Sequence, residues 1–210
     1  SGSVKISGSK NAALPMMTAC ILSDHNITLN GIPDLADVKT LITLLDSMGM
    51  KTKKNHKGSF TFNASEIESK FASYELVKTM RASIMVLGPL LAKHGEAKVS
   101  LPGGCAIGAR PVDLHIEGLE KLGASIEIKD GYILASAERL IGSTYSFPKK
   151  SVTGTANILM AATLAEGETE IGNAACEPEI VQLGELLNSM GAKIEGLGED
   201  FISIEGGRES

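Results

Sequence analysis

One cysteine of the sequence stands where a thiol could act as a nucleophile or as a proton donor. Cys105 lies in the glycine-rich stretch PGGCAIGARP (residues 102–111), called the cysteine loop below, and Arg110 follows it five residues later. A helix expected to begin near Val112 adds the partial positive charge of its N-terminus. Because a cation and a helix N-terminus both stabilise a thiolate, this pattern favours a reactive thiol over a structural one.

A second group of residues could bind an anion. Lys10 and Asn11 stand just before an apolar helix, where unpaired backbone N–H groups attract phosphate. The alternative is a solvated lysine beside an asparagine that caps the helix. Arg81 has no acidic neighbour in the sequence, so a ligand-binding role and a plain surface role are both open. Asp113, just beyond the cysteine loop, could accept hydrogen bonds from a ligand or simply stabilise its helix N-terminus.

Three copies of one pattern must position these residues. The copies cover residues 27–51, 99–126 and 170–194, and each reads as strand, loop, helix, glycine and strand. Counted back from the glycine, apolar residues recur at positions −11, −4 and −1, which places them on one helical face. The middle copy has two additional residues, and they lie in the cysteine loop. This insertion indicates that the loop has a function of its own.

The repeat also predicts the fold. An apolar helix precedes each copy and a pair of short strands follows it, so the unit is βαβαββ and about 70 residues long. One unit cannot bury both faces of its helices. We therefore expect an inside-out α/β barrel around a pseudo-threefold axis, with the helices inside and the sheets outside. A single domain, residues 3–206, would hold the three repeats, at about 4–64, 65–137 and 138–206.

Composition excludes several classes of protein. The 210 residues carry a net charge of −5, which gives no sign of a nucleic-acid partner or an anionic membrane surface. The apolar stretch at residues 83–92 is far shorter than the roughly 20 residues that cross a bilayer, so membrane insertion is not expected. Three cysteines without C-x-x-C spacing fit reduced thiols in the cytoplasm, and we expect Cys20 and Cys176 to be small buried hydrophobic side chains. The histidines show no metal-ligand spacing, and dinucleotide or nucleoside triphosphate motifs are absent.

Five segments together closely resemble the bacterial UDP-N-acetylglucosamine enolpyruvyl transferases. They are ISGSKNAALP (6–15), YELVKTMRAS (74–83), SLPGGCAIGARPVDLHIEGLEKLGA (100–124), AATLAEG (161–167) and EPEIV (177–181). The resemblance covers nearly the whole chain. It implies transfer of the enolpyruvyl group of phosphoenolpyruvate to the 3-hydroxyl of UDP-N-acetylglucosamine, with release of phosphate and entry of the sugar into peptidoglycan synthesis. It also implies that no metal or organic cofactor takes part.

The resemblance further implies roles for single residues. Cys105 would protonate the methylene carbon of phosphoenolpyruvate, form a covalent adduct with it and be alkylated by fosfomycin. Lys10 would bind the phosphate of phosphoenolpyruvate and Arg110 its charged groups, and Asn11 and Arg81 would complete the contacts to phosphate and sugar nucleotide. The uridine diphosphate site would be lined by Arg110, Pro111, Val112, Asp113, Leu114, Lys149, Ser151, Val152 and Thr153.

Members of the family are about twice as long as this chain, so the resemblance implies that a second domain of the same protein is missing. We expect the fragment to fold without turnover. Three alternatives remain open at this point. The chain could serve an enolpyruvylshikimate phosphate synthase-like transferase, it could be a non-catalytic ligand-binding module, or it could have an assembly role through the apolar face that the missing domain leaves bare.

Overall fold

A computed structural model describes residues 2–6, 8–102 and 112–207 of the chain. The first repeat comprises β1 (Gly2–Lys5), α1 (Lys10–Ala19) with the short 3-10 helix η1 (Cys20–Leu22), β2 (Ile27–Asn30), α2 (Ala36–Met48), β3 (Lys51–His56) and β4 (Ser59–Asn63). The second comprises β5 (Phe71–Ala72), α3 (Tyr74–Val77), the 3-10 helix η2 (Arg81–Val86), α4 (Leu87–His94), β6 (Glu96–Ser100), α5 (Asp113–Lys121), β7 (Ser125–Lys129) and β8 (Tyr132–Ser136). The third comprises β9 (Thr144–Ser146), α6 (Val152–Ala162), β10 (Glu168–Gly172), α7 (Pro178–Ser189), β11 (Lys193–Glu195) and β12 (Phe201–Glu205).

The described strands form three four-stranded sheets with one topology. The strand orders are β1-β2-β4-β3, β5-β6-β8-β7 and β9-β10-β12-β11. In each sheet the first two strands are parallel and the remaining neighbours are antiparallel. A parallel pair needs a helical crossover, whereas an antiparallel pair can be joined by a tight turn. The alternation of helices and hairpins in the sequence therefore gives the βαβαββ unit, and the predicted α/β fold of three such repeats is confirmed.

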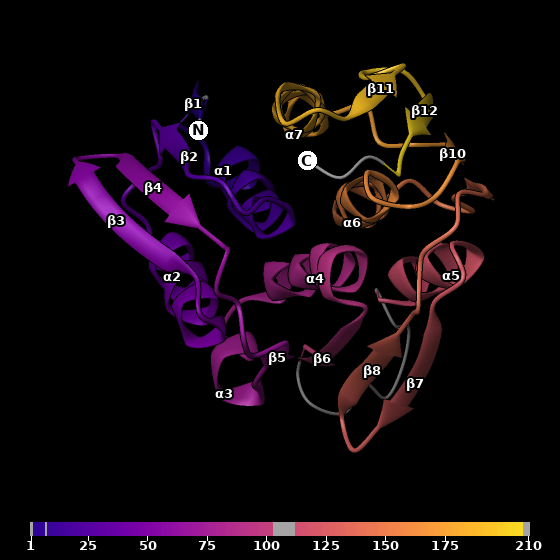
Figure 1. Ribbon diagram of the computed structural model, residues 1–210, viewed down its shortest axis with the longest axis horizontal. Coiled ribbons are helices and arrows are strands. Elements are labelled where there is room, and N and C mark those ends of the chain that lie inside the picture. Colours follow the sequence, from indigo (N-terminus) through magenta and orange to yellow (C-terminus); the bar gives the residue numbers. More distant parts are fainter. Residues whose placement is uncertain (1, 7, 103–111, 208–210) are drawn as a thin grey trace.

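Helices fill the centre of the molecule and the sheets surround them (Figure 1). Helices α1, α4 and α6 are the innermost, and α6 contacts both α1 and α4. Every residue from 154 to 162 in α6 is buried, as is every residue from 12 to 19 in α1. A helix that is apolar on all sides needs such surroundings. The N-terminal turns of α1 and α6 carry four of the residues singled out in the sequence: Lys10, Asn11, Val152 and Thr153.

The glycines that close the three pattern copies adopt the conformation expected of them. Gly49, Gly123 and Gly191 have φ angles of 111°, 95° and 108°. This left-handed region is costly for other residues, so glycine ends the helix and turns the chain toward the next strand. The apolar positions preceding them are buried, except Met190, which is partly exposed.

Two expectations from the sequence are corrected by the structure. The apolar helix expected before the second pattern copy begins as the 3-10 helix η2 and becomes α-helical at Leu87. Pro89, which has no N–H to donate, is thereby confined to the first turn of α4, where its missing hydrogen bond does no harm. Cys20 is buried as expected, and burial raises the pKa of its thiol, but Cys176 is exposed. Cys176 lies just before Pro178 at the start of α7, while the two preceding alanines fill the buried positions.

Candidate functional site

Three of the residues expected in the site, Cys105, Arg110 and Pro111, lie outside the described part of the chain. The others belong to the N-terminal turns of α1, η2, α5 and α6 or to the residues just before them. Within residues 2–6, 8–102 and 112–207, no group of three or more His, Cys, Asp or Glu side chains is arranged to hold a metal ion. In the same part of the chain no helix is long and apolar enough to span a bilayer.

Lys10 begins α1, and its ammonium group lies 3.1 Å from a carboxylate oxygen of Asp37 in the first turn of α2. Both side chains are partly exposed. The helix cap is Ser9, whose hydroxyl accepts a hydrogen bond of 3.2 Å from the backbone N–H of Ala12. The idea that Asn11 caps this helix is therefore wrong, because Asn11 lies inside the first turn. Its exposed side chain remains available to a ligand.

Arg81 begins η2 and is exposed. Its guanidinium makes no ion pair or hydrogen bond with the described residues. A ligand anion could therefore bind to it without displacing a partner in this part of the chain.

The residues after the cysteine loop divide between core and surface. Val112 is 4% exposed and its side chain packs in the core, so only its backbone is available to line a ligand site. Asp113 begins α5 and is exposed, and Leu114 is partly buried. An acidic side chain in the first turn also stabilises the helix.

The N-terminus of α6 supplies the other nucleotide-site candidates. Ser151 caps the helix by accepting a hydrogen bond of 3.0 Å from the backbone N–H of Gly154. Val152 and Thr153 follow in the first turn and are partly buried. Lys149 is exposed, whereas the ammonium group of Lys150 donates to the carbonyl of Ala174 at 2.9 Å. Lys149 is thus the cation of this pair that remains available to a ligand.

A cavity of about 250 Å³ joins several of these elements. It is lined by Asn11, Leu14, Pro15, Ala82, Met85, Val152, Thr153, Ala156 and Glu179. These residues come from α1, η2, α6 and α7, so the cavity lies where the N-terminal parts of helices from all three repeats meet. Pro15 has no N–H, which leaves the carbonyl of Asn11 without its usual helical donor. The cavity wall is mainly apolar, with a few polar groups that could orient a ligand.

Sequence reasoning missed Glu179, although a signal was present. Glu179 stands twelve residues before Gly191, and Asp37, the partner of Lys10, stands twelve residues before Gly49. Aligning the repeats on their glycines would therefore have marked both acidic residues as equivalent positions in the first turns of α2 and α7.

A buried polar cluster behind the cavity wall was also missed, because the histidines of the sequence show no metal-ligand spacing that would single out one of them. His115 on α5 is 2% exposed. Its Nδ1 lies 2.9 Å from Nδ2 of Asn157, and its Nε2 lies 3.3 Å from the hydroxyl of Thr153. Burial lowers the pKa of His115 to about 4, so its ring is neutral near pH 7.

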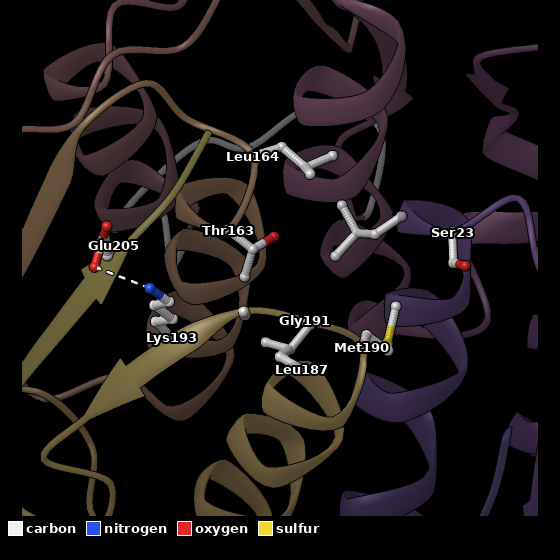
Figure 2. A pocket seen from close by; sticks show the side chains of 10 residues that line it. Ser23, Thr163, Leu164, Leu187, Met190, Gly191, Lys193 and Glu205 are labelled. Atoms are coloured by element: carbon white, nitrogen blue, oxygen red, sulfur yellow. Dashed lines mark ion pairs between the residues drawn. The ribbon is translucent and has the colours of Figure 1, made fainter. Parts of the chain in front are cut away.

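A second cavity, of about 270 Å³, lies at the other ends of the inner helices (Figure 2). Its lining residues include Ser23, Thr163 and Met190 and belong to the C-terminal ends of α1 with η1, α6 and α7. The ion pair drawn there joins Lys193 and Glu205 at 3.9 Å. None of the residues expected in the site lines this cavity.

Comparison with known proteins connects this geometry to a family. The family model for EPSP synthase (3-phosphoshikimate 1-carboxyvinyltransferase) matches residues 1–210. Among curated proteins, the UDP-N-acetylglucosamine 1-carboxyvinyltransferases of Hydrogenovibrio crunogenus and Campylobacter hominis are each 55% identical to the chain over 205 residues, and that of Idiomarina loihiensis is 56% identical over 207 residues. Each alignment covers 98% of this chain and 49% of the relative, so the chain spans about half the length of these relatives.

Solved structures show the same fold at low sequence identity. The enolpyruvyl transferase NikO from Streptomyces tendae superposes with a TM-score of 0.83 at 20% identity, covering 98% of this chain and 48% of NikO. EPSP synthase from Acinetobacter baumannii superposes with a TM-score of 0.72 at 19% identity, covering 99% of this chain and 48% of that chain. With the repeat, the shared fold and a family match that spans every residue, the conclusion is that this chain belongs to the EPSP synthase family.

Proposed function

We propose that the chain carries one half of the active site of an enzyme that transfers the enolpyruvyl group of phosphoenolpyruvate to the 3-hydroxyl of UDP-N-acetylglucosamine. The observation that carries this proposal is the 55% identity to proteins named for that carboxyvinyl transfer, over 98% of the chain. The placement of Asn11, Val152 and Thr153 around one cavity supports it. The product would be a precursor for peptidoglycan, made in the cytoplasm, where Cys105 would stay reduced.

The site residues suit a reaction between two anionic substrates. Lys10 and Arg81 bring positive charge to the helix N-termini around the cavity, and Arg110 would add to it. The ion pair of Lys10 with Asp37 is partly exposed, and such pairs contribute only about 0–1 kcal/mol. A phosphate group can therefore replace the carboxylate of Asp37 at little cost. Cys105 would protonate the methylene carbon of phosphoenolpyruvate as the sugar hydroxyl adds to the neighbouring carbon and gives its proton to a base, and phosphate would then leave as the new methyl group loses a proton.

We also propose that the rest of the active site belongs to a second domain of the same protein. The curated relatives are about twice as long as this chain. Residues 3–206 would form one domain of three repeats, and the second domain would close over the substrates. The chain alone would then bind substrate without turnover.

Alkylation by fosfomycin tests the role of Cys105, and the structure provides internal controls for it. Intact-mass and peptide mass spectrometry would follow labelling with and without UDP-N-acetylglucosamine. We expect fosfomycin to modify Cys105 selectively and faster with the sugar nucleotide. A general thiol reagent should also modify the exposed Cys176 but not the buried Cys20. Equal fosfomycin labelling of Cys105 and Cys176 would contradict the proposal.

The substrate can be tested separately, because the family model carries the name of a shikimate phosphate enzyme. Calorimetric titration of the chain with UDP-N-acetylglucosamine and with shikimate 3-phosphate compares the two acceptors. We expect binding of the sugar nucleotide alone, since the solved EPSP synthase is only 19% identical to the chain. Preferential binding of shikimate 3-phosphate would instead assign the chain to the alternative transferase.

A further inference from the structure

In the polar cluster behind the cavity, two backbone groups determine which side-chain atoms donate hydrogen bonds and which accept them. The N–H of Gly88 lies 2.6 Å from Oδ1 of Asn157, and the carbonyl of Ile84 lies 2.9 Å from Nδ2. A backbone N–H can only donate and a carbonyl can only accept. The amide of Asn157 therefore has one possible orientation, with its NH₂ group toward Ile84 and toward His115.

This orientation determines the tautomer of His115. Nδ2 of Asn157 donates to Nδ1 of His115 at 2.9 Å, so Nδ1 must carry a lone pair. In a neutral imidazole the proton then resides on Nε2. The Nε2–H group faces the hydroxyl oxygen of Thr153 at 3.3 Å and donates to it.

The hydroxyl proton of Thr153 remains available to donate a hydrogen bond. Its oxygen accepts from His115, so the hydroxyl proton must point elsewhere, and it makes no further hydrogen bond with the described residues. Thr153 also lines the cavity of about 250 Å³, beside Asn11 and Val152. A hydroxyl proton without a partner at a cavity wall can donate to a ligand.

We propose that His115 is a positioning residue that fixes Thr153 as a hydrogen-bond donor toward the cavity, and that Thr153 thereby selects a ligand with an acceptor oxygen at this point. The inference rests on the proposed function, under which the ligand is the sugar nucleotide. Asn157 fixes the tautomer of His115, and the Nε2–H group of His115 occupies the acceptor side of the Thr153 hydroxyl, which leaves that hydroxyl as a donor. The cluster links α6, which carries Thr153, to α5 and to the junction of η2 with α4.

Titration of the chain with UDP-N-acetylglucosamine tests the donor. Thr153→Val removes the hydroxyl but keeps the side-chain shape, and we expect it to weaken binding about three- to tenfold, the range for one hydrogen bond. Thr153→Ser keeps the hydroxyl and should bind within about twofold of the unaltered chain. The matched control is Thr163→Val at the other end of α6, since the hydroxyl of Thr163 donates to the carbonyl of Met160. Thr163→Val should leave binding unchanged.

A double-mutant cycle tests the part played by His115. If His115 acts through Thr153, His115→Leu and Thr153→Val should lower affinity by similar factors, and the double variant should lose little more. If the two losses in affinity multiply in the double variant, the two residues act independently and the inference is overturned. If His115→Leu does not fold, the tautomer of His115 in the unaltered chain tests the inference instead.

Nitrogen-15 NMR of the His115 ring reads that tautomer without any ligand. A protonated Nε2 and an unprotonated Nδ1 are expected near pH 7. A proton on Nδ1, or equal binding by the unaltered chain and Thr153→Val, would overturn the inference. A chain that shows the expected tautomer but binds no sugar nucleotide would support the donor assignment and refute the proposed function, so the two failures are distinguishable.

Discussion

Acid is expected to destabilise this chain through His115 more than through an ordinary histidine. Burial lowers the pKa of His115 from 6.5 to about 4, and the ring lies among partners that require it to be neutral. As the pH falls below 6.5, the unfolded chain binds a proton at this site before the folded chain does. The stability contribution is therefore fully present above pH 6.5 and is lost as the pH falls toward about 4.

The size of this effect follows from the two pKa values. One pKa unit corresponds to about 1.4 kcal/mol, so the free energy of unfolding should fall by about 2–3 kcal/mol between pH 7 and pH 4.5 because of His115 alone. Urea unfolding, followed by circular dichroism at a series of pH values, measures it. The His115→Gln variant provides the baseline, because carboxylates and other histidines titrate in both proteins.

His94 requires its own control, because burial and the nearby Lys70 and Lys93 also lower its pKa. A His94→Gln variant should retain the steep loss attributed to His115, whereas His115→Gln should flatten it. The His115→Gln variant can be less stable at every pH without affecting the test, since the difference in slope is what is measured. Parallel curves for the unaltered chain and His115→Gln between pH 7 and pH 4.5 would refute the reasoning.

Two further changes test the packing that holds the site. Asn157→Ala removes the amide that satisfies two backbone groups and one ring nitrogen in the core, so urea unfolding should show a loss of at least about 3 kcal/mol. Gly49→Ala should cost more than Gly191→Ala, because an added Cβ at Gly49 would lie 2.5 Å from the carbonyl oxygen of Glu66, whereas nothing lies within 4 Å at Gly191. Both variants carry the strain of a left-handed backbone, about 1–2 kcal/mol. Equal losses in the free energy of unfolding would show that the backbone around Glu66 moves away from the added Cβ without cost.

Local signals in the sequence were sufficient to predict most of the fold. Glycines in left-handed positions end the helices, and apolar residues at helical spacing face the core, so each copy of the pattern determines its own strand, helix and turn. The threefold repetition of the βαβαββ unit then indicated the inside-out barrel. The 3-10 start before α4 was missed because the apolar pattern is the same for both helix types, and only Pro89 in the first turn of α4 marks the change.

The site was only partly predictable, because its contacts join residues far apart in the chain. Ser9 caps α1, and not Asn11 as one of the two alternatives had it, a difference of two positions that sequence spacing does not resolve. Cys176 is exposed in the loop before α7, whereas Ala174 and Ala175 are buried there, and no periodicity in the sequence marks this change. His115 and Asn157 are 42 residues apart, and neither shows a ligand-like spacing. Their pairing emerges only when α5 and α6 pack together.

Stability explains Asn157, which pairs two buried backbone groups, but it gives no reason for the imidazole of His115. Burying an imidazole costs desolvation energy, and an apolar side chain of similar size in place of His115 would fill the same space without it. Both N–H donors of the amide, its oxygen and both ring nitrogens are hydrogen-bonded, so the desolvation cost of the pair is offset. What the polar groups provide is direction, because an apolar cluster could not fix where the Thr153 hydroxyl points. His115→Leu leaves the two backbone bonds of Asn157 in place and only one amide N–H unpaired, so it should cost less stability than Asn157→Ala and still remove the preference for a ligand oxygen at Thr153.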